Sequence, residues 1–519
     1  MSKFLKGTAI LLLAGFITRV LGFINRIAIA RFIGEEGVGL YMMAYPSLVL
    51  VITITQFGLP VAISKNIAEA EARGEYAKIK KILVVSLATT LTLSAIFTPA
   101  LILLAPWLAE TLFTDNRTFY PLIAIAPVVP VIAVSSVLRG YFQGRQNMKP
   151  AAYSQILEQF FRIVLIAVMT KAFLPYGIEY AAAGAMLSAV IGEIVSLCYL
   201  MAAFKLKKKF RLRTDFFKFV RSGRQPFREL MNVAVPTTGS RLIGSISWFF
   251  EPIVVSHSLG LAGIAAAVAT KQYGALTGFA MPLLLLPSFI TYSLATSLVP
   301  AISEANSKND GKLIEYRLQQ SLRFAFLTGG ISVAMLYVLA EPLMVLMYGS
   351  ENGAQFIRLM APFFLFYYYQ GPLQAALQAL NLAKAAMINS LIGAVVKTAV
   401  IFVLASQPSF GIKGAALGII TGFVLVTLLH FATVLKKISF SFYVLDYLKA
   451  FLAIGISGYA GYFIYVNLIG GTSILYRVLL SSASMAVIYI ILVLFLKLIR
   501  PAELKRIPYI GPFLSRLSF

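Results

Sequence analysis

The chain has 519 residues, of which 59% are hydrophobic and 13% charged, and its formal net charge is +25. A soluble domain cannot bury this much apolar surface, whereas a bundle of membrane helices exposes it to lipid. The composition therefore excludes soluble classes and predicts a polytopic all-α membrane protein. Lys and Arg in cytoplasmic loops explain the basic excess, so no nucleic-acid partner is expected.

Apolar windows of about 20 residues, long enough to cross a bilayer, predict fourteen helices. In chain order they lie at roughly 8–30, 40–64, 82–106, 119–142, 151–173, 180–204, 230–257, 272–302, 322–347, 356–380, 385–406, 412–435, 447–467 and 475–499. With the N-terminus inside, the even-numbered connections are cytoplasmic, and about 33 of the 45 basic residues fall there. Both termini are therefore expected on the cytoplasmic side of the cell membrane.

The chain also repeats itself at a spacing of about 230–240 residues. Ala62-Ile63-Ser64 recurs as Ala301-Ile302-Ser303, and three further residues recur in order at one offset: Gln143, Lys149 and Arg162 match Gln378, Lys384 and Lys397. The repeat predicts two six-helix lobes related by a pseudo-two-fold axis, with a substrate site between them. The expected organisation is an N-lobe 1–204, a basic cytoplasmic linker 205–228, a C-lobe 229–437, two extra helices within 438–500 and a cytoplasmic tail 501–519.

Six basic side chains within these apolar stretches or at their edge are the candidates for an internal cavity. They are Arg19, Arg26, Arg162, Arg241, Lys271 and Lys397. A charge at the bilayer centre costs roughly 2.5–3.5 kcal/mol even on the lenient insertion scale, so such residues normally face an internal cavity. Several cations in a cavity predict an anionic cargo, and the planar fork of arginine suits phosphate.

Four of these cations are the candidate substrate-binding residues. Arg19 and Arg26 are seven residues apart, on nearly the same face of the first helix. Arg241 lies on the helix that the repeat pairs with the first one, so it is expected to face Arg19 across the cavity. Lys271 opens the next helix, where snorkelling to the outer interface is an equally simple explanation.

The other charged residues of the windows have different expected roles. Glu158 and Arg162, four apart, are expected to form a structural ion pair within one lobe. Lys397 and Glu251 are candidates for coupling to an ion, while Glu193 has no partner in register. Arg139 is assigned to a cytoplasmic turn, and Asp115 to the scattered acids of the external loops.

Nothing in the sequence predicts an enzyme. It has no phosphate-binding loop, no Cys/His metal cluster and no nucleophile elbow. We therefore expect no catalytic residue, cofactor or resident metal.

Several segments carry a family resemblance. The stretch containing TRVLGF and IARFIG, and the later segments FGLPVAISK, LRGYFQGRQNM, PTTGSRLIGSISWFFEPIVV and APFFLFYYYQGPLQAALQALN, closely resemble the stage V sporulation protein B family. The first of them also resembles the first helix of the MurJ-type lipid II flippases. Both groups belong to the multidrug/oligosaccharidyl-lipid/polysaccharide exporter superfamily, whose fold is two six-helix lobes.

The resemblance implies a flippase for an undecaprenyl-diphosphate-linked glycan of the lipid II type, serving spore cortex peptidoglycan. The family's cavity arginine on the first helix matches Arg19, while a second falls on Asn25, beside Arg26, and a third matches Arg241. The MurJ-type proteins bind sodium through acidic residues on their seventh and eleventh helices. Sodium coupling does not transfer to this chain, because its eleventh predicted helix carries Asn389, Lys397 and Thr398 but no acid. The last two helices are expected to line a groove for the lipid tail.

Three alternatives stay open at this stage. Another polyprenyl-linked polysaccharide precursor is the first, because the sequence does not identify the sugar. A cation-coupled drug exporter predicts membrane-embedded acids as cation sites, against which the excess of basic residues argues. A scaffold that recruits cell-wall synthesis proteins through the basic 205–228 segment predicts that the arginines in the membrane are dispensable.

Overall fold

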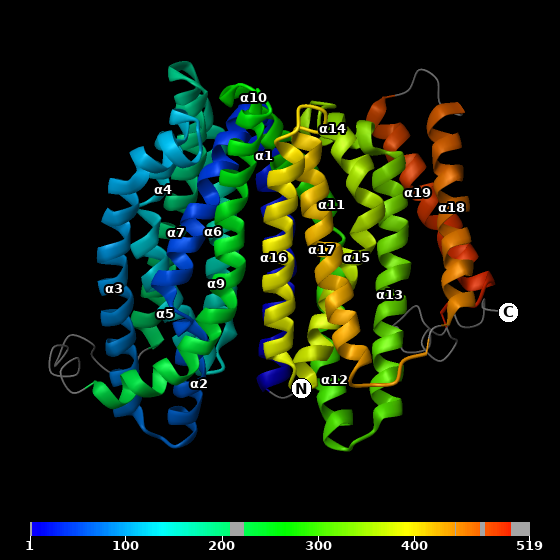
Figure 1. The fold of residues 1–519 in the computed structure, drawn as a ribbon. Coiled ribbons are helices and arrows are strands. Elements are labelled where there is room, and N and C mark those ends of the chain that lie inside the picture. The colour runs from blue at the N-terminus through cyan, green and yellow to red at the C-terminus, as the bar shows by residue number, and fades with distance from the viewer. Residues whose placement is uncertain (1–2, 208–222, 442, 468–472, 500–519) are drawn as a thin grey trace. The chain divides into compact units, whose positions relative to one another are not determined.

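The computed structural model describes residues 3–207, 223–441, 443–467 and 473–499 (Figure 1). Within these ranges every regular element is a helix, which confirms the predicted all-α class. Most of the predicted linker 205–228 and nearly all of the tail 501–519 lie outside the described residues.

All fourteen predicted windows are helical. The long helices are α1 (Lys3–Gln56), α2 (Leu59–Ala72), α3 (Tyr76–Trp107), α5 (Val128–Gly144), α6 (Met148–Phe173), α7 (Ile178–Lys207), α9 (Arg224–Leu261), α12 (Ser288–Ser307), α13 (Gly311–Val338), α15 (Ala354–Ala379), α16 (Ala383–Ala405), α17 (Ile412–Leu435), α18 (Val444–Asn467) and α19 (Ile474–Phe495). Shorter helices are α4 (Phe119–Ile125), α10 (Ala266–Tyr273), α11 (Met281–Leu285) and α14 (Ala340–Tyr348).

The observed helices begin and end at other residues than the predicted windows where the backbone breaks or bends. The first two windows are joined in α1, which bends at Gly34 with φ 62°. The second window then breaks at Phe57 and Gly58, whose φ values of 44° and 61° are left-handed, and restarts as α2 with a proline in its first turn. The eighth window is divided by the π-helix Gly274–Ala280, a wider turn that marks an irregular point in a helix.

Ten of the described helical stretches are long and apolar enough to cross a membrane, and an eleventh counts if the bent pair 266–285 and 288–307 is one span. The stretch from Ala14 to Ala72 contains two of the predicted windows. The windows at 151–173 and 356–380 are helical as α6 and α15, although they are not among those stretches.

The described chain packs as two compact units. Unit 1 contains residues 1–278 and 405–412, and unit 2 contains residues 279–404 and 413–519. Unit 1 therefore includes α9 and α10, which the sequence repeat assigns to the C-lobe. The repeat and the packing divide the chain at different points, and the lobes of the repeat stay a prediction.

Glycines let the helices of unit 1 approach one another closely. A Cβ atom at Gly140 of α5 would lie 2.9 Å from the Pro60 carbonyl oxygen of α2, and one at Gly192 of α7 would lie 2.9 Å from the Glu158 carbonyl oxygen of α6. The contact of α1 with α10 is closer still, because a Cβ at Gly39 would overlap the carbonyl oxygen of Thr270. Backbone-to-backbone contact at these points admits only glycine.

Helix α13 organises unit 2 through two adjacent glycines. A Cβ at Gly329 would overlap the ring of Tyr368 on α15, and one at Gly330 would overlap the side chain of Ile454 on α18. Tyr489 of α19 donates a hydrogen bond of 2.7 Å to the carbonyl oxygen of Leu327. The hairpin of α18 and α19 is therefore fixed to unit 2 through α13.

Candidate functional site

Two of the predicted cations converge on one hydroxyl in unit 1. Arg162 of α6 donates a hydrogen bond of 2.7 Å from Nη2 to the Tyr41 hydroxyl. Arg26 of α1 lies within electrostatic range of the same hydroxyl, and Tyr41 is 3% exposed. The fold therefore gathers positive charge where α1 and α6 pack, inside a unit rather than on a loop.

Aromatic rings extend this place toward α9. Tyr41 stacks on Tyr45 with ring centroids 5.6 Å apart, and Trp248 of α9 meets Tyr45 edge-on at 5.8 Å. A hydrogen bond of 2.8 Å between Thr53 and Ser245 fastens the same pair of helices. These rings were not predicted, although the spacing of Tyr41 and Tyr45 by one helical turn is visible in the sequence.

Glu158 lies within electrostatic range of Arg162, and its ion pair is part of a network around Arg139. Arg139 Nη2 lies 3.4 Å from Glu158 Oε2, 3.0 Å from Glu193 Oε1 and 3.0 Å from Ser196 Oγ. Glu193 thus has a partner, and Arg139 is not confined to a turn, because its side chain is 19% exposed and reaches α6 and α7. An arginine on a neighbouring helix competes with an i,i+4 partner, and sequence spacing cannot reveal it.

The charges of this cluster do not cancel. Arg26, Arg139 and Arg162 are three cations, while Glu158 and Glu193 are two carboxylates. Both carboxylates are engaged by Arg139. The formal charge of these five side chains is therefore +1, and Glu158 lies within electrostatic range of Arg162 as well as of Arg139.

The other predicted site residues lie outside this cluster, on α1, α9 and α10 of unit 1 and on α16 of unit 2. Arg19 is exposed on α1, and Arg241 is exposed on α9, one turn before Ser245. Lys271 is exposed on α10, and the partly buried Glu251 is within electrostatic range of Tyr273. Lys397 belongs to unit 2, where its aliphatic stem covers Gly422 of α17: a Cβ at that glycine would lie 2.8 Å from the Lys397 Cβ.

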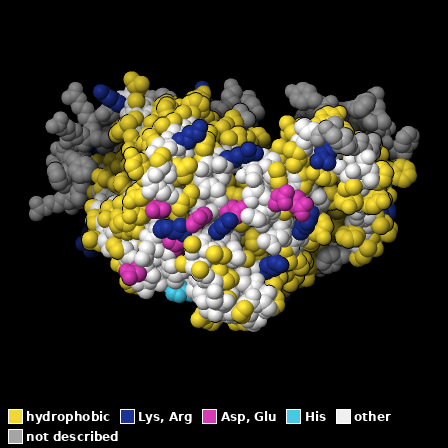
Figure 2. Space-filling view, turned by 90° about the horizontal axis from the view of Figure 1, so that it is seen from above, with side chains coloured by type: hydrophobic (Ala, Val, Ile, Leu, Met, Phe, Trp, Pro, Cys, Tyr) yellow, Lys and Arg dark blue, Asp and Glu magenta, His cyan; other side chains and the backbone are white. Residues whose placement is uncertain are grey.

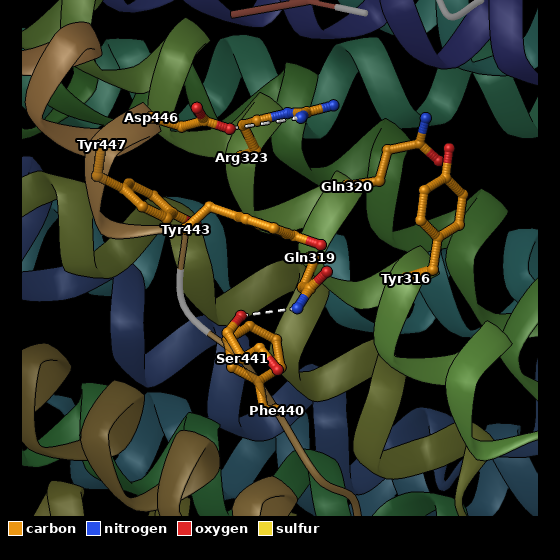
Figure 3. Close-up of a pocket in the computed structure, with 9 residues that line it drawn as sticks. All are labelled: Tyr316, Gln319, Gln320, Arg323, Phe440, Ser441, Tyr443, Asp446 and Tyr447. Carbon is orange, nitrogen blue, oxygen red and sulfur yellow. Dashed lines mark hydrogen bonds and ion pairs between the residues drawn. The ribbon is translucent and has the colours of Figure 1, made fainter.

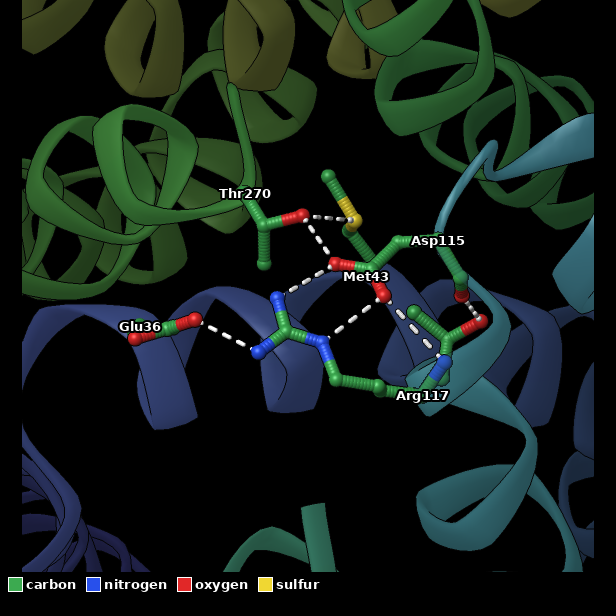
Figure 4. A network of polar contacts seen from close by, with 6 residues as sticks. Glu36, Met43, Asp115, Arg117 and Thr270 are labelled. Carbon is green, nitrogen blue, oxygen red and sulfur yellow. Dashed lines mark hydrogen bonds and ion pairs between the residues drawn. The ribbon is translucent and has the colours of Figure 1, made fainter. Parts of the chain in front are cut away.

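A second polar network closes one end of unit 1 (Figure 4). Arg117 donates two hydrogen bonds to the Asp115 carboxylate, of 3.0 Å from Nε and 2.9 Å from Nη2. It also forms an ion pair with Glu36 of α1. Thr270 of α10 donates a hydrogen bond of 2.8 Å to the same carboxylate. Asp115, predicted as a scattered loop acid, is instead 6% exposed and joins α10 to the loop after α3. Figure 2 looks down on the end that carries α10 in Figure 1 and shows acidic and basic side chains side by side there.

This network makes stability depend on pH. Burial alone raises the pKa of Asp115, but the hydrogen bonds from Arg117 and Thr270 outweigh it, so that the pKa is lowered. The folded state therefore favours the carboxylate, and the resulting stability is present above about pH 4, the ordinary range of an aspartate, and is lost as the pH falls through the folded pKa.

We expect Asp115→Asn to lower the melting temperature of the purified protein at neutral pH, because the amide cannot replace the charged partner of Arg117. The difference from wild type should shrink as the pH falls below about 4, where the wild-type carboxylate is protonated too. Glu351→Gln, at an exposed acid, is the control. A difference that stays constant from neutral to acid pH would contradict the role of the charge.

Unit 2 contains a pocket of a different kind (Figure 3). It lies between α13 and the segment that leads into α18, and its lining residues are Tyr316, Gln319, Gln320, Arg323, Phe440, Ser441, Tyr443, Asp446 and Tyr447. Gln319 donates a hydrogen bond of 2.6 Å to the carbonyl oxygen of Ser441, and Arg323 lies 4.0 Å from Asp446. These contacts fasten the start of α18 to α13, and none of the predicted site residues lines the pocket.

Comparisons with known proteins place the chain in a family. The profile of the family described as "Polysaccharide biosynthesis protein" matches residues 4–306, and the MatE profile matches residues 245–403. Stage V sporulation protein B of Bacillus subtilis (strain 168) is 60% identical over 513 residues, covering 99% of each chain.

Two solved structures share the fold. The lipid II flippase MurJ in an inward closed conformation has a TM-score of 0.68 at 17% identity, covering 92% of this chain and 97% of its own. An inward-facing multidrug resistance MATE family transporter of the MOP superfamily has a TM-score of 0.66 at 17% identity, covering 81% and 96%. The chain therefore belongs to the polysaccharide biosynthesis protein family, in the group of stage V sporulation protein B and with the fold of the MOP transporters.

Proposed function

We propose that the chain flips an undecaprenyl-diphosphate-linked glycan of the lipid II type from the inner to the outer leaflet by alternating access. The observation that carries this proposal is the excess of positive charge around Tyr41, where Arg26 and Arg162 converge. A diphosphate is the anionic part of such a lipid, and arginines bind phosphate oxygens with paired hydrogen bonds. The names of the relatives, one a sporulation protein and one a lipid II flippase, agree with this substrate class.

Arg19, Arg26 and Arg241 are the proposed diphosphate ligands, and Lys271 is a further contact along the path. The polyprenyl tail would stay in lipid beside α18 and α19. An inside-negative membrane potential would favour outward movement of an anion by roughly 2.3 kcal/mol per charge per 100 mV.

In a spore-forming cell the glycan would serve the cortex, and the cell-wall synthesis proteins that use it are the proposed partners. Both termini would be cytoplasmic.

The test is exposure of lipid II at the outer leaflet of cells depleted of their own flippase. We expect the intact chain to restore exposure and the double variant Arg19→Ala/Arg241→Ala to abolish it, because two of the three proposed phosphate ligands are lost. Arg19→Lys keeps the charge but not the planar fork and should be intermediate.

The matched control is Arg228→Ala, which removes an exposed arginine near the start of the same helix as Arg241 and should leave exposure unchanged. Full activity in the double variant would contradict the assignment of the arginines. No restoration by the intact chain, with the protein present in the membrane, would contradict lipid II and favour another polyprenyl-linked glycan.

A further inference from the structure

The pocket of unit 2, between α13 and the start of α18, is open to the exterior (Figure 3). Its empty space is about 370 Å³ and includes space shared with the surroundings. Two of its lining residues are well exposed, Tyr316 by 36% and Tyr443 by 45%. A polar group that stays attached to a larger molecule can therefore enter it.

The residues that line the pocket carry one cation and one carboxylate. These are Arg323 of α13 and Asp446 of α18, which lie at one edge of the pocket with 4.0 Å between Nη1 and Oδ2. That separation is longer than a hydrogen bond, so it leaves room for a ligand that contacts both charges. The nearby Glu315 accepts hydrogen bonds from Gln319 and from the Ser441 N–H. The pocket thus presents both signs of charge and suits a zwitterion.

The pocket lies where two spans are expected to enter the bilayer. Both α13 and α18 are long and apolar enough to cross a membrane, and the windows predicted for them begin at 322 and 447. The lining residues lie within 316–323 and 440–447, at or just before these starts, which is the level of the lipid headgroups. Exposed apolar side chains, Leu448 and Leu452, follow on α18. A molecule in the pocket would therefore continue along an apolar surface.

We propose that this pocket binds the headgroup of a zwitterionic phospholipid with a primary amine, of the phosphatidylethanolamine type. The Arg323 guanidinium would bind the phosphate, and the Asp446 carboxylate would accept hydrogen bonds from the ammonium group. The rings of Tyr443 and Tyr447 line the same pocket, and aromatic faces attract cations. The acyl chains would lie on the apolar surface of α18. This site belongs to unit 2 and does not depend on the proposed diphosphate ligands of unit 1.

The test is native mass spectrometry of the purified full-length protein with four probes: dioctanoyl phosphatidylethanolamine, phosphatidylcholine and phosphatidylglycerol, and free O-phosphoethanolamine. We expect the ethanolamine lipid to bind about three- to tenfold more tightly than the other two lipids, because a primary ammonium donates charge-assisted hydrogen bonds to a carboxylate. Free O-phosphoethanolamine lacks the chains that bury apolar surface, so it should bind more weakly than the lipid.

Two variants separate the two charges. Asp446→Asn should remove the preference for ethanolamine and strengthen binding of phosphatidylglycerol, because the carboxylate no longer repels an anionic headgroup. Arg323→Gln should weaken all three lipids, because the phosphate loses its cation. The exposed ion pair of Glu341 with Arg358, 2.9 Å apart in the same unit, supplies the controls. Glu341→Gln and Arg358→Gln should leave the ranking of the lipids unchanged.

The ranking of the lipids distinguishes a binding role from a structural one, since loss of a structural contact would weaken all lipids alike. Equal binding of the three lipids by wild type, or an unchanged ranking in Asp446→Asn, would overturn the proposal. Free O-phosphoethanolamine that binds as tightly as the lipid would indicate a soluble zwitterion and overturn the lipid assignment. Arg323 is buried, so if Arg323→Gln does not fold, the partly exposed Asp446 decides the test.

Discussion

Replacing Arg139 by methionine should destabilise the protein by about 3–5 kcal/mol, because it removes the partner of two carboxylates at once. Arg139 Nη2 lies 3.0 Å from Glu193 and 3.4 Å from Glu158. Their side chains are only 4% and 18% exposed, so water cannot replace the guanidinium. The measurement is unfolding of the purified protein in mixed micelles by increasing denaturing detergent.

A compensating variant shows whether Arg139→Met lowers stability because it leaves two buried carboxylates without a cation. The triple variant Arg139→Met/Glu158→Gln/Glu193→Gln removes the whole set of charges and should recover most of the stability, since a network of neutral groups needs no buried cation. Arg228→Met, at an exposed arginine, is the control for the substitution itself. If the triple variant were no more stable than Arg139→Met, packing rather than charge would explain the effect.

The second large effect is expected at Gly39. Alanine there places a methyl group against the carbonyl oxygen of Thr270, and backbone cannot move aside as a flexible side chain does. We expect Gly39→Ala to destabilise the protein by about 1–3 kcal/mol, the usual cost of overpacking. Glycosylated-lipid exposure in cells should fall with it, because α10 is displaced from α1.

Gly15 offers a control on the same helix. A Cβ at Gly15 meets nothing within 4 Å, so Gly15→Ala gains helix propensity, worth up to about 1 kcal/mol, without a clash. The pair should therefore change stability in opposite directions, which thermal unfolding of both variants measures. Equal stability of the Gly39 and Gly15 variants would contradict this prediction, because it would show that α10 can move away from α1 at little cost in stability.

The sequence was sufficient to predict the long helices of the described residues, because fourteen apolar windows of the right length leave little choice of structure. It was less informative about where helices break. The window predicted at 40–64 passes over the break at Phe57 and Gly58, and the window at 272–302 passes over the π-helix Gly274–Ala280. The predicted orientation rests on the charges of the loops, and it stays a prediction.

The site was predicted only in part, for a physical reason. Isolated charges in apolar windows identify Arg26 and Arg162, since the bilayer makes such residues costly. Which groups meet is set by tertiary packing: Arg139 reaches Glu158 and Glu193 from another helix, and no spacing in the sequence encodes that.

The two glycines of α13 have a consequence for how any rearrangement is transmitted. Tyr368 of α15 and Ile454 of α18 pack against the adjacent glycines Gly329 and Gly330, so that α13 is in close contact with both helices. The α18–α19 hairpin would then move together with unit 2 in any rearrangement. Exposed apolar side chains along the hairpin, such as Phe451, Tyr459 and Phe495, would change their lipid contacts when it does.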